Sequence, residues 1–250
     1  GSTGVGRKLL KSAADQVLKP AMELGGNAPV LVLKDADLDV AIDGTMLAKM
    51  RNLGEACTAA NRIYVHESIA PAFTARLAER MSALKVGDGT DPSVDVGPLV
   101  NAGTRDKVAG FVADAVAKGA QIECGGTVPN GPGYFYPPTV LSNVPESADC
   151  VHDEIFGPVA AIQTFADEED AIARANATEY GLVAYVFSAD FKRAMQVCER
   201  LDYGMVGLNR GLVSDPAAPF GGTKQSGLGR EGGHEGMLEF METQYISADW

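Results

Sequence analysis

The chain has 250 residues, of which 46 % are hydrophobic, and a formal net charge of −12. This length allows one large domain or two modest ones, and the hydrophobic share is enough for a buried core. The negative charge disfavours nucleic acid and anionic membranes as partners, because both attract Lys and Arg rather than carboxylates.

In chain order, the predicted elements are a helix over 7–17, strands over 19–23 and 29–33, a helix from Asp35 or Asp37 to about Met50, a strand over 62–66, helices over 69–81 and 108–116, strands over 121–124 and 159–165, a helix over 168–177, a strand over 182–187, a helix over 191–201, and strands over 205–208 and 242–247. Strands and helices alternate. This alternation predicts an α/β fold with a mostly parallel sheet flanked by helices.

No apolar run is long enough to span a bilayer, and no basic start followed by an apolar stretch predicts a secretory signal. The four cysteines are widely spaced, and neither a CxxC nor an HExxH pattern occurs. These features favour a cytoplasmic protein with free thiols and no metal site.

The first six residues, GSTGVG, already form a glycine-rich turn. A strand normally precedes such a turn, so we expect the chain to be a fragment that lacks its N-terminal part. The alternative is that Gly1 and Ser2 are a cloning remnant, and both can hold.

Cys57 is the first candidate for chemistry. It lies in the segment RNLGEACTAANR, over 51–62, where small residues surround the thiol in a predicted loop between a helix and a strand. A nucleophile needs such access, although most cysteines in globular proteins are buried and inert.

Two carboxylates are further candidates. Glu23 stands directly before Leu24-Gly25-Gly26, where nothing bulky restricts its side chain, and an ordinary surface role is the alternative. Glu154 begins the segment EIFGP, which places a carboxylate and an aromatic ring ahead of a rigid turn. A purely structural turn is the alternative for this segment.

Four segments occur in a specific order: ELGG at 23–26, the cysteine loop, EIFGP at 154–158 and PFGG at 219–222. Together they resemble the aldehyde dehydrogenase superfamily, and all 250 residues are similar to roughly the second half of a member. The resemblance implies that residues 1–24 are a remnant of the dinucleotide-binding domain, that 25–222 form the catalytic domain, and that 223–250 form a C-terminal loop and an oligomerisation strand.

The resemblance implies a role for each matching residue. Cys57 would attack the aldehyde carbon to form a thiohemiacetal and later a thioester, and Glu23 would activate the water that hydrolyses it. The cofactor would be NAD or NADP: Glu154 would bind its nicotinamide ribose, Phe156 would pack beside the nicotinamide, and Ser2 would lie near the pyrophosphate.

The resemblance is closest to the succinate-semialdehyde dehydrogenase branch. There, Arg51 and Ser214 would hold the carboxylate of the substrate and Phe220 would line the aldehyde tunnel. A structural salt bridge is the alternative for Arg51, and Arg62 is predicted to be structural. A broader aldehyde dehydrogenase, acting on other small or acidic aldehydes, is the alternative function.

If the chain is a fragment, its predicted activity is limited by the part that is missing. Without the first cofactor strands, the chain should bind cofactor poorly and be inactive or weakly active alone, so a catalytically silent domain remains a further alternative. The expected partners are a small, carboxylated aldehyde and, at full length, further copies of the protein in a homo-oligomer. The choice between NAD and NADP depends on residues that precede Gly1.

Overall fold

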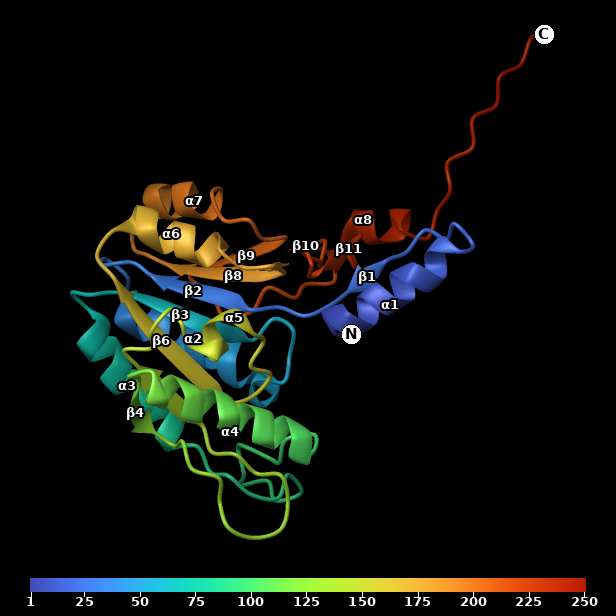
Figure 1. Ribbon diagram of the computed structural model, residues 1–250. Coiled ribbons are helices and arrows are strands. Elements are labelled where there is room, and N and C mark those ends of the chain that lie inside the picture. The colour runs from blue at the N-terminus through green and yellow to red at the C-terminus, as the bar shows by residue number, and fades with distance from the viewer.

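A seven-stranded sheet organises the protein in the computed structural model, which describes residues 1–250 (Figure 1). From one edge to the other, its strands are β4 (Gln121–Cys124), β5 (Thr139–Ser142), β6 (Val159–Phe165), β3 (Ala60–His66), β2 (Ala28–Val32), β8 (Val183–Phe187) and β9 (Met205–Leu208). All neighbouring strands are parallel except β4 and β5, which are antiparallel. The predicted α/β fold with a mostly parallel sheet is therefore confirmed.

The helices are α1 (Thr3–Ala14), α2 (Leu38–Met50), α3 (Ala70–Ser82), α4 (Ala102–Ala117), α5 (Asp149–His152), α6 (Glu168–Asn176), α7 (Phe191–Cys198) and α8 (Gly233–Leu238), with a 3-10 turn η1 (Arg51–Gly54) after α2. Four short strands lie outside the main sheet: β1 (Met22–Glu23), β7 (Tyr180–Gly181), β10 (Thr223–Lys224) and β11 (Gly227–Leu228). None of the helices is long and apolar enough to cross a membrane.

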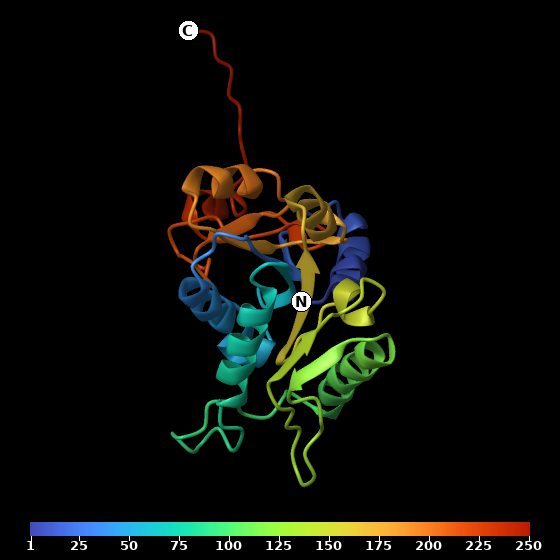
Figure 2. The ribbon, with the colours of Figure 1, turned by 90° about the vertical axis from the view of Figure 1, so that its left-hand side faces the viewer.

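Helices cover both faces of the sheet, as Figure 2 shows for α2 and α3 on one side and α4 on the other. Strand β2 is buried along its whole length, and its side chains alternate between the two layers. Val30 and Val32 pack with α2 and α3, whereas Leu31 and Leu33 pack with α6 and α7. The continuous apolar run in the sequence thus reflects a strand that is buried on both faces.

The start of α2 is set by Asp37 rather than Asp35. The Asp37 side chain accepts hydrogen bonds from the backbone N–H groups of Asp39 and Val40, which satisfies donors that have no partner within the helix. Asp35 instead accepts a hydrogen bond from the Ser188 hydroxyl. The structure therefore decides between the two caps that the sequence left open.

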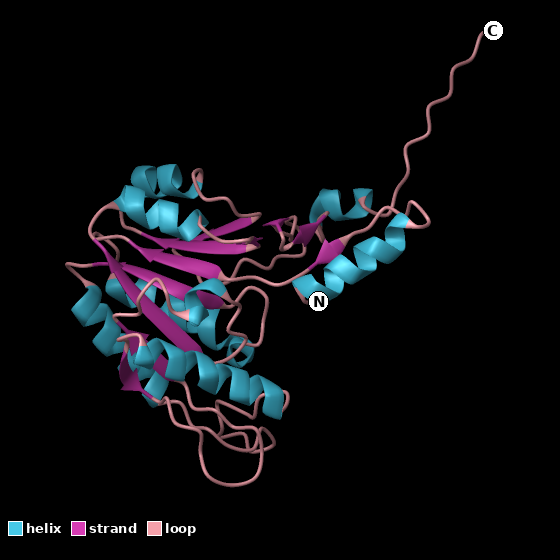
Figure 3. Ribbon diagram, in the orientation of Figure 1, coloured by secondary structure: helices cyan, strands magenta, loops and turns pink.

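The strand predicted over 242–247 does not form within the single chain, and its expected pairing with a second copy of the protein stays a prediction. The last residues extend away from the body of the protein without regular structure, as Figure 3 shows, and their side chains are exposed. A strand needs a neighbour for its backbone hydrogen bonds, and this segment has none within the chain. Seven short elements were not predicted, because each has two to six residues and no clear periodicity: η1, β5, α5, β7, β10, β11 and α8.

The segment after residue 222 returns to the beginning of the chain. β11 pairs with β1, so that Glu23 lies opposite Gly227, and β10 pairs with β7. The ladder of β1 and β11 fixes the position of Glu23 against a part of the chain about two hundred residues away. The domain boundaries expected at residues 24 and 222 stay predictions.

Candidate active site

Cys57 lies in the loop between η1 and β3, half-buried. Three consecutive residues, Asn52, Leu53 and Gly54, have positive φ angles of 52°, 58° and 75°. The side-chain amide of Asn52 donates a 2.7 Å hydrogen bond to the carbonyl of Glu55. This left-handed turn reverses the chain after α2 and leads it to Cys57.

The loop that carries Cys57 contacts the segment between β1 and β2 directly. A methyl group added at Gly26 would lie 2.2 Å from the carbonyl oxygen of Cys57. No side chain fits at that distance, so the ELGG segment needs glycine here for close packing rather than for flexibility. This contact brings Cys57 to the segment that begins with Glu23.

Glu23 is the last residue of β1 and is partly buried. Burial and the neighbouring Glu231 carboxylate raise its pKa to about 7, against the opposing effect of the Arg230 guanidinium. Its Oε2 atom is buried and has no hydrogen-bond partner within the chain. A carboxyl group with a pKa near neutrality and one free oxygen is suited to accept a proton from water.

Glu154 follows α5 and reaches the same glycines. Its Oε1 accepts a 2.9 Å hydrogen bond from the backbone N–H of Gly26, and its Oε2 accepts none from the chain. A methyl group at Gly25 would come within 3.2 Å of Oε2. Burial raises the pKa of Glu154, although the Gly26 hydrogen bond and the Lys107 ammonium oppose this effect.

These three groups lie close enough to interact electrostatically. Burial raises the pKa of the Cys57 thiol, and the carboxylates of Glu154 and then Glu23 raise it further. The sulfur is therefore not sealed in an apolar interior, but this arrangement favours the thiol over the thiolate. A reactive cysteine more often has a lowered pKa, so the electrostatics of this site do not by themselves activate the thiol.

Phe156 has a positive φ of 52° in the turn after Glu154 and is half-buried. The next residue, Gly157, contacts the turn before Cys57, because a methyl group at Gly54 would lie 2.3 Å from the carbonyl oxygen of Gly157. The EIFGP segment and the cysteine loop are thus in direct backbone contact, which the sequence could not show.

The predicted substrate residues are more dispersed: Arg51 and Ser214 are exposed, and Phe220 is half-buried. Arg51 begins η1 and forms no ion pair; its guanidinium lies 3.5 Å from the hydroxyl of Thr58, the residue after Cys57. Ser214 and Phe220 line the same hollow of about 350 Å³, together with Glu231. Ser2 is exposed and caps α1, where its hydroxyl accepts a 3.3 Å hydrogen bond from Val5. The structural salt bridge considered for Arg51 is absent.

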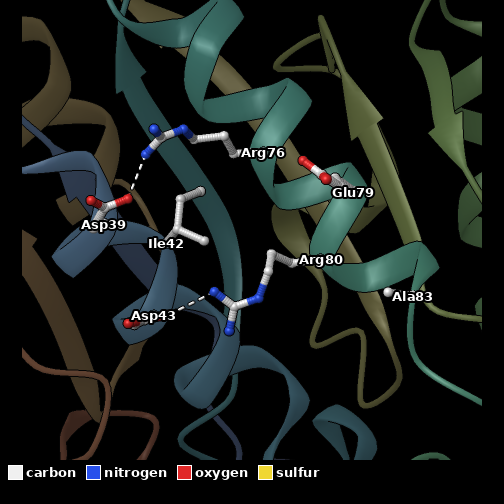
Figure 4. A pocket seen from close by; sticks show the side chains of 7 residues that line it. All are labelled: Asp39, Ile42, Asp43, Arg76, Glu79, Arg80 and Ala83. Carbon is white, nitrogen blue, oxygen red and sulfur yellow. Dashed lines mark hydrogen bonds and ion pairs between the residues drawn. The ribbon is translucent and has the colours of Figure 1, made fainter.

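A larger hollow than that of Ser214 and Phe220 lies elsewhere. It has a volume of about 410 Å³ and runs between α2 and α3, where Arg76 pairs with Asp39 at 2.6 Å and Arg80 pairs with Asp43 at 2.7 Å (Figure 4). Both of its arginines are already paired with carboxylates, and it contains no nucleophile. We therefore assign the chemistry to the surroundings of Cys57.

Sequence reasoning missed the charged groups around this site. Glu231 and Arg230 act on Glu23, and the buried Lys49 acts on Glu154. Apolar residues spaced four positions apart indicate the buried face of a helix. No pattern in a single sequence indicates that a lysine is buried. Only the packed structure identifies Lys49.

The chain is similar to known proteins along nearly its whole length. The family model described as "Aldehyde dehydrogenase family" matches residues 1–246. A succinate-semialdehyde dehydrogenase of Paenarthrobacter nicotinovorans is 57 % identical over 98 % of this chain and 55 % of its own length. A glutarate-semialdehyde dehydrogenase of Pseudomonas aeruginosa is 45 % identical over 98 % of this chain and 51 % of its own length.

Solved structures agree. The crystal structure of succinate-semialdehyde dehydrogenase from Burkholderia pseudomallei superposes with a TM-score of 0.94 and 48 % identity, over 96 % of this chain and 50 % of that one. The chain spans about half the length of the curated relatives it matches. On the family match, the identities and the shared fold, the chain belongs to the aldehyde dehydrogenase family.

Proposed function

We propose that this chain is the catalytic half of an NAD(P)-dependent dehydrogenase that oxidises succinate semialdehyde to succinate. The observation that carries the proposal is the packing of the Cys57 loop and of Glu154 against the glycine pair at 25–26, close to Glu23 in the chain. Glu23 and Glu154 both act electrostatically on the Cys57 thiol. A nucleophile, a base and a cofactor-binding carboxylate are the groups that this oxidation requires. The similarity to succinate-semialdehyde dehydrogenases supports the choice of substrate.

Cys57 starts the reaction. Its sulfur, once deprotonated, bonds to the aldehyde carbon and gives a thiohemiacetal, and the backbone N–H of Cys57 helps to stabilise the developing oxyanion. Loss of hydride from that carbon leaves a thioester on Cys57. Glu23, with a pKa raised to about 7 by burial, then accepts a proton from the water that hydrolyses the thioester.

The residues present fit a nicotinamide cofactor, which would supply the hydride acceptor when bound. Oε2 of Glu154 accepts no hydrogen bond from the chain, so it is free to accept one from a ribose hydroxyl. Gly25 leaves room beside this oxygen, which a larger residue would fill. Phe156 would border the nicotinamide, and Ser2, at the start of α1, would face the pyrophosphate.

Arg51 and Ser214 would select the substrate. The Arg51 guanidinium is exposed, carries no ion pair and lies beside Thr58, so it is available to a carboxylate near the nucleophile. Ser214 would add a hydrogen bond, and Phe220 in the same hollow would cover the apolar carbons.

A second candidate is oxidation of a longer or broader range of acidic aldehydes. The exposed position of Arg51 favours it, because a side chain held only by one long hydrogen bond, to Thr58, can reach carboxylates at different distances. The glutarate-semialdehyde dehydrogenase relative supports the same possibility. Homo-oligomer formation and a cytoplasmic location complete the proposal.

The test compares substrates in the whole protein that contains this chain. Arg51→Ala should lower kcat/KM for succinate semialdehyde by about 10- to 100-fold, as expected for one lost charge-assisted hydrogen bond, and leave that for an uncharged aldehyde such as butanal nearly unchanged. Arg80→Ala, which removes an exposed arginine between α2 and α3, is the matched control. Equal losses for both aldehydes would contradict the proposed role of Arg51.

A further inference from the structure

Lys49 is a lysine in the interior of the protein with no solvent exposure. It lies near the end of α2, and its Nζ donates a 3.0 Å hydrogen bond to Oδ1 of the buried Asn61 in β3. This is the only hydrogen bond that the ammonium makes within the chain. Removing a charge from water is costly, and an apolar residue of the same length would fill the site without that cost.

The side chain of Lys49 passes beneath the contact between two catalytic loops. A methyl group added at Gly54 would lie 3.1 Å from Cε of Lys49 and 2.3 Å from the carbonyl oxygen of Gly157. The stem of Lys49 therefore supports the point where the loop of Cys57 contacts the loop of Glu154.

The ammonium also interacts electrostatically with ionisable groups of neighbouring elements. These are the Cys150 thiol of α5 and the Glu154 carboxylate in the loop after α5. Burial lowers the pKa of Lys49 to about 7, and both groups oppose this effect. The Lys49 ammonium in turn helps to keep Glu154 ionised.

We propose that Lys49 is a positioning residue for the active site. Anchored by its hydrogen bond to Asn61, it holds the loops of Cys57 and Glu154 together and places its ammonium beside the Glu154 loop. The proposal rests on the proposed function for the roles of Cys57 and Glu154. It assigns the buried lysine a task that its packing alone does not require.

Two variants separate the two parts of this role. Lys49→Met keeps an unbranched apolar stem but removes both the charge and the donor to Asn61. Lys49→Gln removes the charge and keeps an N–H donor. Lys192→Met, which removes an exposed lysine of α7, is the control for a change in net charge.

Amide hydrogen exchange reports on the loops without cofactor or aldehyde. In Lys49→Met, peptides over 51–58 and 153–158 should exchange at least about tenfold faster, whereas the strands of the sheet keep their protection. Lys49→Gln should restore most of the protection in these two loops. Faster exchange throughout the sheet, or no change in the two loops, would overturn the positioning role.

Titration of Glu154 reports on the charge. It can be followed by NMR of chain labelled with 13C-glutamate, with the Glu154 signal assigned from its absence in Glu154→Gln. Both Lys49 variants should raise the titration midpoint of Glu154, which corresponds to at least about threefold tighter proton binding, and Lys192→Met should not. An unchanged midpoint in both variants would overturn the electrostatic part.

These outcomes are distinguishable from failure of the proposed function. If the whole protein does not oxidise succinate semialdehyde, the substrate is wrong, but exchange and titration still decide the role of Lys49. If Lys49→Met does not fold, Lys49→Gln carries the titration, and Lys49→Leu, which also lacks a donor for Asn61, carries the exchange measurement with the same expected loss of protection in the two loops.

Discussion

The backbone N–H of Gly26 donates a 2.9 Å hydrogen bond to Oε1 of Glu154, across more than a hundred residues of sequence. On another side, the same glycine packs against the carbonyl oxygen of Cys57. A single residue without a side chain thus fixes the distance between the nucleophile and the carboxylate proposed to hold the cofactor. The relative positions of these groups depend on backbone contacts that leave little freedom.

Gly26→Ala tests this contact. The new methyl group would lie 2.2 Å from the Cys57 carbonyl oxygen, so the cysteine loop must move. We expect a loss of about 1–3 kcal/mol in the free energy of unfolding, as for other overpacked sites. Urea denaturation measures this loss, and alkylation of Cys57 followed by mass spectrometry should show an altered rate.

Gly110→Ala is the matched control for the same added methyl group. Gly110 lies in α4, and nothing is within 4 Å of the added methyl position. Alanine favours a helix over glycine, so this variant should gain about 0.5–1 kcal/mol. Equal effects of the two substitutions would show that the contact between Gly26 and Cys57 does not constrain the loop.

Arg62 was predicted to have a structural role, and its buried hydrogen bonds confirm it. Its guanidinium is buried in β3, with hydrogen bonds to the carbonyls of Asn27, Arg174 and Ala175 and to the hydroxyls of Tyr64 and Tyr203. Arg62→Met would leave buried carbonyls without donors, so we expect a loss of about 3 kcal/mol or more in the free energy of unfolding.

Thermal and urea unfolding measure the effect of Arg62→Met. Arg80→Met removes an arginine whose ion pair with Asp43 is exposed, and such pairs contribute at most about 1 kcal/mol. Comparable losses in the two variants would mean that the hydrogen bonds of Arg62 contribute no more than a surface ion pair.

The sequence predicted most of the sheet because burial leaves a direct trace in it. The spacing of Phe73, Leu77 and Met81 matches one buried face of α3, and all three side chains have no solvent exposure. The segment over 242–247 shows the converse, since strand-forming residues without a partner form no strand. Local pattern is informative only where the packing partner belongs to the same chain.

The candidate reacting groups of the site could be predicted from the sequence. The burial and the charges that surround them could not. Cys57 and Glu23 stand beside small residues that a reader of the sequence can recognise. The raised pKa of the Cys57 thiol depends on burial and on Glu154, which is far away in sequence, and the burial of Lys49 depends on three elements packing together. Long-range contacts of this kind have no signal in a single sequence.

Glu23 should give stability a characteristic pH dependence. Burial raises its pKa from 4.5 to about 7, so the folded chain binds this proton more tightly than the unfolded chain. Its contribution to the free energy of unfolding therefore falls as the pH rises from about 4.5 to about 7 and is constant outside this window. Glu23→Gln removes the carboxylate, so relative to the wild type the variant should gain stability between pH 4 and pH 8.

Glu169→Gln serves as the control with the opposite sign. The hydrogen bond from Arg200 lowers the pKa of Glu169, so its contribution to stability is present at neutral pH and is lost as the solution becomes acidic. Urea unfolding at both pH values measures the two trends. The same trend for both variants would show that the buried position of Glu23 does not govern its protonation.

Alkylation of the thiols tests the electrostatics around the nucleophile. The carboxylate of Glu154 raises the pKa of Cys57, so Glu154→Gln should increase the thiolate fraction at pH 8. We expect the rate of Cys57 alkylation by iodoacetamide to rise about three- to tenfold. Cys124 provides the internal control, because burial and Glu123 raise its pKa without a contribution from Glu154.

Cys150 extends the same comparison to a sealed thiol. It has no solvent exposure, and burial raises its pKa to about 11, so its alkylation should be the slowest in both proteins. Peptide mass spectrometry resolves the rates of the individual cysteines. A catalytically silent domain predicts slow alkylation at Cys57 as well, with no response to Glu154→Gln. Faster modification confined to Cys57 would instead show that its sulfur is accessible and that Glu154 controls its ionisation, as the proposed oxidation requires.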